Sequence, residues 1–212
     1  GKSTTSLVMA QELAVHVPTA IIDADPNRPI TSWAGEGNVP KSLTVITNTS
    51  EQSILDEIDD SAEQAKFVIV DLEGVFSRRV TYAISRADLV LVPMQKQKLD
   101  ADMAVRVIQE IARESKHQRR PIPFALAFTK TRVVAEPKTA RRIAGDIRAR
   151  SAIDVIDVDL HERDAFSAMW DFGRALRDLD PKSVNNVQAA IENAGGFTQA
   201  VVNRFKTKRK AA

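Results

Sequence analysis

The stretch Gly1-Lys2-Ser3-Thr4 opens the chain and leads directly into a pattern typical of a helix over 5–15, which Pro18 closes. This sequence at the start of a helix is typical of the second half of a phosphate-binding loop, because free backbone N–H groups and the positive end of the helix dipole face a bound anion. We expect the preceding strand and the first half of the loop to lie upstream of Gly1. A solvated helix start, capped by Ser3 or Thr4, is the alternative interpretation.

In such a loop, the chemistry of each residue predicts a role. Lys2 would reach the β- and γ-phosphates, the Ser3 hydroxyl would be a ligand of Mg²⁺, and Thr4 would contact the α-phosphate. Gly1 would belong to the same nucleotide-binding loop, and Lys2 would also act in catalysis. The predicted cofactors are therefore ATP and Mg²⁺.

Short, continuously apolar runs alternate with helical patterns along the rest of the chain. Expected strands span 19–22, 67–70, 89–92, 124–128 and 153–158, with a possible edge strand over 43–47. Expected helices span 53–65, 77–86, 101–115, 138–150 and about 165–172, followed by a helical region over 183–205 that Gly195-Gly196 interrupts. This alternation predicts a doubly wound α/β fold, with a mostly parallel sheet covered by helices on both faces.

Carboxylates follow two of the expected strands, at the edge where parallel sheets bind their ligands. Asp23-Ala24-Asp25-Pro26 ends the first strand; Asp23 would hold a magnesium-bound water and Asp25 would orient the attacking water. Asp71 ends another apolar run, in the form of a Walker B strand that holds Mg²⁺ through water. Gly74 then stands where a backbone amide could meet the γ-phosphate and switch with it. Ordinary polar turns are the alternative at both places.

These motifs resemble those of the ParA/MinD-type ATPases, whose deviant Walker A motif reads K-G-G-x-G-K-[ST]-[ST]. Residues 1–4 match its last four positions, 21–26 resemble the family's D-x-D-P segment, and 67–74 resemble its Walker B strand and switch II. Many members have proline where this chain has Glu73. Within the family, 23–33 and 161–166 look most like the VirC-type ATPase that assists T-DNA transfer.

The resemblance implies a single P-loop ATPase domain over 1–212 that dimerises with ATP between the subunits. Asp25 would assist hydrolysis and Asp71 would act with it. Asp159 and Leu160 would contact the nucleotide on its adenine side, and Thr129, at the end of an earlier strand, would also bind the nucleotide. The implied partners are duplex DNA, bound with weak sequence selectivity, and a centromere-binding or DNA-transfer protein.

Composition restricts the other possibilities. The 212 residues include no cysteine, which excludes a disulfide framework, a thiolate metal site and a catalytic thiol. We therefore expect a cytoplasmic protein, and the resemblance implies that it associates with the nucleoid or a plasmid. The formal net charge is +2, yet four basic residues crowd a tail over 206–212. Candidate DNA contacts lie in this tail and in basic clusters of the folded part, and comprise Arg119, Arg120, Arg141, Arg142, Arg163, Lys206, Lys208, Arg209 and Lys210.

The sequence favours a slow ATP hydrolase, stimulated by DNA or a partner, that acts as a switch in plasmid partition or DNA transfer. Two alternatives stay open. One is an adaptor that binds nucleotide with negligible turnover and positions a protein partner. The other is a metabolic P-loop kinase or ligase, for which no acceptor-substrate motif is evident.

Overall fold

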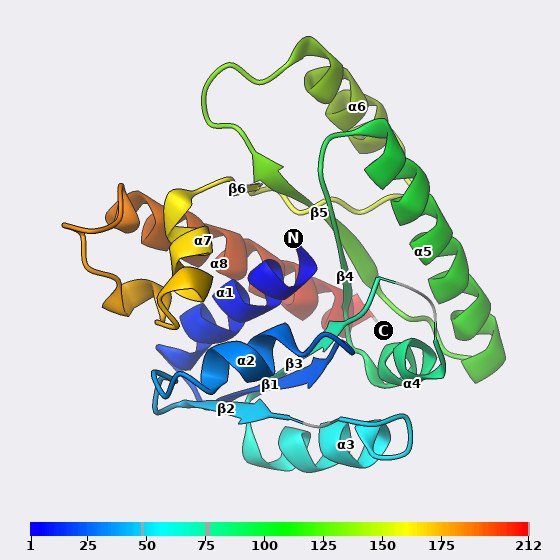
Figure 1. Cartoon of the computed structure of the whole chain (residues 1–212). Helices are drawn as coiled ribbons and strands as arrows, with labels where there is room; N and C mark the ends of the chain where they lie inside the picture. Colours follow the sequence, from blue (N-terminus) through cyan, green and yellow to red (C-terminus); the bar gives the residue numbers. More distant parts are fainter. Residues whose placement is uncertain (48, 75–76, 212) are drawn as a thin grey trace. The chain divides into compact units, whose positions relative to one another are not determined.

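The computed structural model describes residues 1–47, 49–74 and 77–211, with side chains through 207. The chain forms two compact units. We call residues 2–86 and 163–198 the β1 unit, and Gly1 with 87–162 and 199–212 the β5 unit. Figure 1 shows the helices and strands of both. Whether they act as the single domain expected from the sequence stays a prediction.

The β1 unit contains a parallel sheet with strand order β2-β1-β3. Its strands are β1 (Thr19–Ala24), β2 (Leu43–Ile46) and β3 (Phe67–Leu72). Helix α1 (Lys2–Ala14) packs on one face, while α3 (Ile54–Gln64) and α4 (Arg78–Arg86) pack on the other, as Figure 1 shows for α1 and α3. The unit also holds α2 (Pro29–Ala34), α7 (Asp164–Asp171) and a 3₁₀ turn, η1 (Leu176–Asp178).

The β5 unit contains three strands in the order β4-β5-β6, all parallel. They are β4 (Val90–Met94), β5 (Phe124–Thr131) and β6 (Leu160–His161). Helix α5 (Lys98–Gln118) packs against β4 and β5, and α6 (Lys138–Arg148) follows β5 in the chain. In both units strands alternate with helices and run parallel, which confirms the predicted α/β class.

The prediction of a strand over 153–158 is wrong. That segment makes a single isolated bridge, from Val155 to Leu126, and the strand forms later as β6. Its carboxylates are engaged elsewhere: Arg204 of α8 contacts Asp154 at 2.6 Å and Asp157 at 3.0 Å. The backbone of the segment meets β5 at Leu126, which donates to the Asp154 carbonyl and accepts from the Ile156 N–H, and the ion pairs with Arg204 engage the carboxylates on both sides of this bridge.

Gly195-Gly196 does not interrupt the last helix, contrary to the sequence prediction. Helix α8 (Val187–Ala211) is continuous, and Ala190, Ala194 and Phe197 on its inner face are fully buried. Each helical glycine costs about 1 kcal/mol relative to alanine, which is less than the gain from burying a phenylalanine side chain. The apolar face of the helix therefore outweighs the two glycines.

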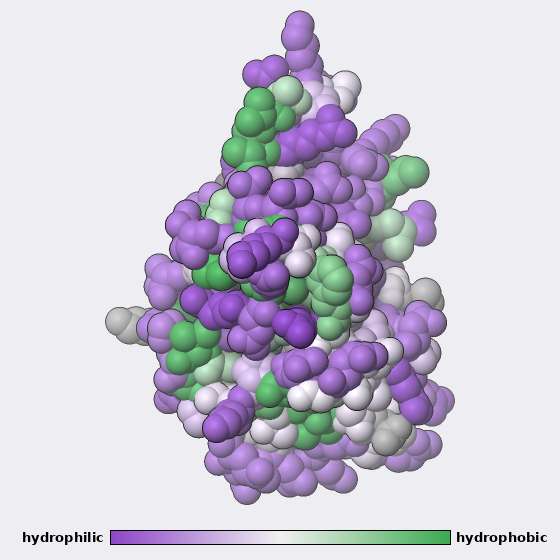
Figure 2. Space-filling model, turned by 60° about the vertical axis from the view of Figure 1, so that its left-hand side comes forward, coloured by the Kyte–Doolittle hydropathy of each residue, from purple (hydrophilic) through white to green (hydrophobic). Residues whose placement is uncertain are grey.

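The surface is mostly polar. Figure 2 shows hydrophilic residues over most of the face it displays, with hydrophobic residues in small groups. Among the described residues, the large apolar side chains that are exposed are Val15, Leu99, Met103, Val105, Val133, Val134 and Phe172. Within the same part of the chain, no helix combines the length and the apolar character needed to cross a bilayer.

Candidate functional site

The first turn of α1 meets the end of β3 in the β1 unit. A Cβ atom built on Gly74 would lie 3.1 Å from the Lys2 Nζ, so the ammonium group sits directly over this glycine. The Ser6 hydroxyl donates to Asp71 Oδ1 at 2.9 Å, and the Ser3 hydroxyl also hydrogen-bonds the Asp71 carboxylate. Lys2, Ser3, Asp71 and Gly74 are thus brought together as the sequence predicts, and Thr4 lies half-buried in the same helical turn.

Asp23 stands beside Asp71, because these two residues are partners in the parallel register of β1 and β3. Asp23 Oδ2 accepts from the Thr31 backbone N–H at 2.7 Å and from the Thr31 hydroxyl at 2.8 Å. The carboxylate therefore caps α2. The sequence analysis predicted neither this helix nor this contact. The D-P-N-R-P sequence before α2 is typical of a turn, so no helix was predicted there, although proline at the first helical position was an available signal.

Each of these two aspartates keeps one buried oxygen without a hydrogen-bond partner in the described structure, Oδ1 of Asp23 and Oδ2 of Asp71. The residues are 2% and 1% exposed. Burial raises the pKa of Asp71 from 3.8 to about 6; the Ser3 and Ser6 hydroxyls oppose this shift, and the charges of Asp23 and Asp25 add to it. Two adjacent buried carboxylates with free oxygens repel each other and favour a bound cation.

The donor set fits Mg²⁺. Among the described residues, no group of three or more His, Cys, Asp or Glu side chains could enclose a metal ion. Magnesium keeps several waters and takes oxygen ligands from one or two carboxylates together with substrate phosphates, so it needs no protein cage. The free oxygens of Asp23 and Asp71, with the neighbouring Ser3 hydroxyl, are ligands of the kind that Mg²⁺ prefers.

Asp25 follows at the exit of β1, half-buried, and its Oδ1 accepts from the Asn27 backbone N–H at 2.8 Å. This Asx turn fixes one carboxylate oxygen of Asp25, and the other has no hydrogen bond among the described residues. Arg79 of α4 donates from Nη1 to the Ala24 carbonyl at 3.0 Å, in the peptide unit just before Asp25. The sequence analysis missed Arg79, because an arginine in a helix is ordinarily a surface residue.

The β5 unit holds the other predicted nucleotide contacts. A Cβ atom on Gly1 would lie 3.5 Å from Thr129 Oγ1, and Thr129 pairs with Leu160 in the register of β5 and β6. Lys130, the next residue, adopts a left-handed backbone (φ 51°) at an irregularity in this register. Thr129 and Thr131 are both buried on either side of it, and Thr131 Oγ1 lies 2.8 Å from His161 Nδ1.

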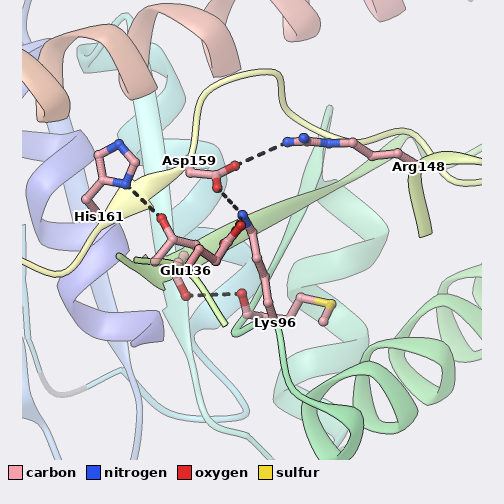
Figure 3. Close-up of polar contacts among 8 residues, drawn as sticks. Lys96, Glu136, Arg148, Asp159 and His161 are labelled. Carbon is pink, nitrogen blue, oxygen red and sulfur yellow. Dashed lines mark hydrogen bonds and ion pairs between the residues drawn. The ribbon is translucent and has the colours of Figure 1, made fainter. Parts of the chain in front are cut away.

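Asp159 belongs to a partly buried ionic cluster at the same edge (Figure 3). Lys96 Nζ contacts Asp159 at 2.7 Å and Glu136 at 2.6 Å, while Arg148 contacts the other oxygen of Asp159 at 3.2 Å. Burial acts to lower the pKa of Lys96, but hydrogen bonds and the charges of its two carboxylate partners outweigh burial and raise it. The Lys96 and Arg148 cations also lie 5.1 and 5.2 Å from the centre of the Phe128 ring.

This cluster was also missed, because its members come from three distant stretches of sequence. The available signal was the position of Lys96, two residues after the end of β4 and thus at the carboxyl edge of the sheet. Two cations and two carboxylates balance in charge, so the cluster fixes the loops after β4 and β5 without adding net charge.

The predicted DNA contacts are dispersed. Arg119, Arg120, Arg141 and Arg142 are exposed in the β5 unit, where Arg142 pairs with Asp146 at 3.2 Å and Arg120 reaches the Ala87 carbonyl at 3.3 Å. Arg163 is half-buried in the β1 unit. Lys206 is exposed, and the side chains of Lys208, Arg209 and Lys210 lie outside the described residues.

Comparison with known proteins shows the family and the fold of the chain. The model of the VirC1 protein family matches residues 1–194. The protein ParA of Rhizobium radiobacter is 40% identical over 209 residues, covering 97% of this chain and 92% of its own. The protein virC1 of Rhizobium rhizogenes is 30% identical over 179 residues, covering 82% and 76%. A complex of Cyanothece McdA with ATP superposes with a TM-score of 0.71 at 12% identity, covering 95% of this chain and 91% of that one.

Proposed function

Since the chain belongs to the VirC1 family and is an ATPase of the ParA/MinD type, we propose that it is a dimeric Mg-ATP switch. In this proposal the ATP state binds duplex DNA, and slow hydrolysis of ATP resets the protein. One observation carries the proposal: Asp23 and Asp71 are adjacent and buried, each keeps a free oxygen, and Lys2 lies beside them over Gly74.

The β1 unit would bind the phosphates. Lys2 neutralises charge on the β- and γ-phosphates, and the N–H groups of the first turn of α1 point at the same anion. Ser3, with Asp23 and Asp71 acting through water, would hold Mg²⁺, which neutralises phosphate charge when bound. Asp25 orients the attacking water through the oxygen that its Asx turn leaves available. Thr4 and Gly74 of the same unit would also contact the nucleotide, and the contacts of Gly1, Thr129, Asp159 and Leu160 with it stay predictions from the sequence.

DNA binding would follow from pairing two subunits. ATP between two copies presents every basic cluster twice on one assembly, so phosphate contacts double and affinity rises steeply. Arg141 is an exposed cation of α6 with no ion pair among the described residues, whereas part of the charge of Arg142 is offset by Asp146. We assign the role to plasmid partition or DNA transfer in the cytoplasm, at the nucleoid or a plasmid, with a centromere-binding or DNA-transfer protein as the stimulating partner.

The test combines oligomeric state with DNA binding in the full-length protein. Sedimentation with ATP and Mg²⁺ should give a dimer, and with ADP a monomer. Filter binding of duplex DNA should show higher affinity with ATP than with ADP, and the affinity should fall as salt increases. The variant Arg141→Glu/Arg142→Glu should lose affinity for all sequences about equally while keeping DNA-free turnover.

The matched control is Lys41→Glu/Lys66→Glu, which changes the charge equally at two exposed positions of the β1 unit. DNA affinity that does not depend on nucleotide, or that falls equally in both variants, would contradict the DNA-switch proposal. ATP binding without turnover would favour the adaptor. Turnover accelerated by a small acceptor molecule in the absence of DNA would favour a metabolic kinase or ligase.

A further inference from the structure

Arg79 occupies an unusual position for an arginine at the start of a helix. Its neighbour Arg78 has a side chain that is 78% exposed and pairs with Glu51 in solvent. Arg79 instead is half-buried, and its Nη1 donates to two backbone carbonyls, that of Ala24 at 3.0 Å and that of Thr49 at 3.5 Å. Its Nε is buried and has no hydrogen-bond partner among the described residues.

The two carbonyls lie beyond the point where β1 and β2 stop pairing, one at the end of β1 and the other in the segment that follows β2. The register of β1 and β2 ends at Ile22 and Ile46. Ala24 lies two residues further along β1, and Thr49 lies three residues further along the chain that leaves β2. The guanidinium of Arg79 therefore replaces ladder hydrogen bonds that the sheet does not make there, and it links both chain segments to the first turn of α4.

What Arg79 holds is the segment that carries the proposed chemistry. Ala24 is the residue between Asp23 and Asp25, so its peptide units lead directly into both carboxylates. Helix α4 begins four residues after Gly74, against which the Lys2 ammonium lies. The side chain thus connects the element that follows the predicted γ-phosphate contact with the element that bears the water-orienting carboxylate.

We propose that Arg79 is a positioning residue, which holds Asp25 for hydrolysis by fixing the Ala24 carbonyl to α4. This inference rests on the proposed function and deepens it. A guanidinium suits the task, because the two N–H groups of Nη1 are fixed in its plane and can donate to the two carbonyls, whereas the three N–H groups of a lysine ammonium rotate freely on a flexible stem.

The experiment measures ATP affinity and turnover in the full-length protein for Arg79→Met, Arg79→Lys and the control Arg78→Met. Arg79→Met should bind ATP within about threefold of wild type and lose turnover by on the order of tenfold or more, a loss that appears in kcat and not in binding. Arg79→Lys should recover only part of the loss. Arg78→Met should match wild type, because its side chain lies in solvent.

A double-mutant comparison separates positioning from a general structural role. If Arg79 acts through Asp25, then Arg79→Met should add almost nothing to the loss already caused by Asp25→Ala. Multiplied losses, wild-type turnover in Arg79→Met, or equal losses of ATP affinity and kcat would overturn the inference. If Arg79→Met does not fold, as judged by its thermal midpoint, Arg79→Lys is compared with Asp25→Ala in the same way.

The same data distinguish this inference from the proposed function. If wild type shows no turnover under any condition, or if Asp25→Ala hydrolyses ATP at the wild-type rate, the proposed function itself fails. If Asp25→Ala is impaired while Arg79→Met is normal, the ATPase proposal stands and only the role of Arg79 is rejected.

Discussion

Replacing Asp71 by asparagine should stabilise the nucleotide-free protein and make its stability less dependent on pH. The carboxylate is 1% exposed, and burial raises its pKa from 3.8 to about 6. A pKa that is raised in the folded state means that the folded protein binds the proton more tightly than the unfolded chain. The stability gained from this proton is complete below pH 3.8 and is lost as the pH rises through about 6.

The size of the effect follows from these two values. A shift of about two pKa units corresponds to roughly 3 kcal/mol between the limits of low and high pH. Between pH 8 and pH 5 the wild-type free energy of unfolding should gain about 1.4 kcal/mol relative to that of Asp71→Asn, which has no proton to bind. At pH 8 the asparagine variant should be the more stable protein, although it should bind Mg-ATP poorly.

Urea unfolding at pH 8, 7, 6 and 5, without nucleotide or Mg²⁺, measures this difference directly. Asp60→Asn is the matched control, because it removes a carboxylate that is exposed on α3. The control should follow wild type at every pH. If the difference in the free energy of unfolding between wild type and Asp71→Asn stays constant from pH 8 to pH 5, burial does not raise the pKa of Asp71 and the reasoning is refuted.

Three further predictions concern other positions. Lys2→Ala should keep the fold and lose ATP binding in calorimetry, and an unchanged affinity would remove the phosphate-loop assignment. Lys96→Met should lower the free energy of unfolding by about 2 kcal/mol, between the values for exposed and buried pairs, because Glu136 loses its ammonium partner and Asp159 keeps only Arg148; a loss close to zero in urea unfolding would contradict this. Gly173→Ala should destabilise by at least about 1 kcal/mol, since the backbone is left-handed and the new Cβ atom would overlap the Glu36 side chain; an unchanged thermal midpoint would show that both can adjust.

Local pattern was enough to predict the strands that carry the site. The runs 19–22 and 67–70 are continuously apolar and end in acid, so β1, β3 and the carboxylates at their ends were all predicted. The same reasoning failed over 153–158, where the polar residues Asp154 and Asp157 are held by Arg204 from 47 to 50 positions away. Apolar periodicity describes burial along one segment and contains no information about such a distant partner.

The missed site residues share a physical cause. Thr31, Arg79 and Lys96 belong to types that usually face solvent, and each is instead drawn inward by a partner that only the fold supplies. Lys96 lies between carboxylates 40 and 63 positions further along the chain, and no spacing rule connects these three residues. The sequence therefore contains signals for the groups predicted to contact the nucleotide, but none for the residues that hold these groups in place.

The ionic cluster around Lys96 also determines what a change in ionic strength can reveal. Its Lys96 side chain is 9% exposed and that of Asp159 is 13% exposed, so mobile ions have little access to the attraction between them. Exposed pairs such as that of Arg86 with Asp59 are screened readily, but pairs of this kind contribute little to stability. Added salt should therefore leave this edge of the β5 unit intact. In a salt series, the loss of DNA affinity would then measure counterion release from the phosphates. Loosening of the loops that the cluster holds would not contribute to that loss.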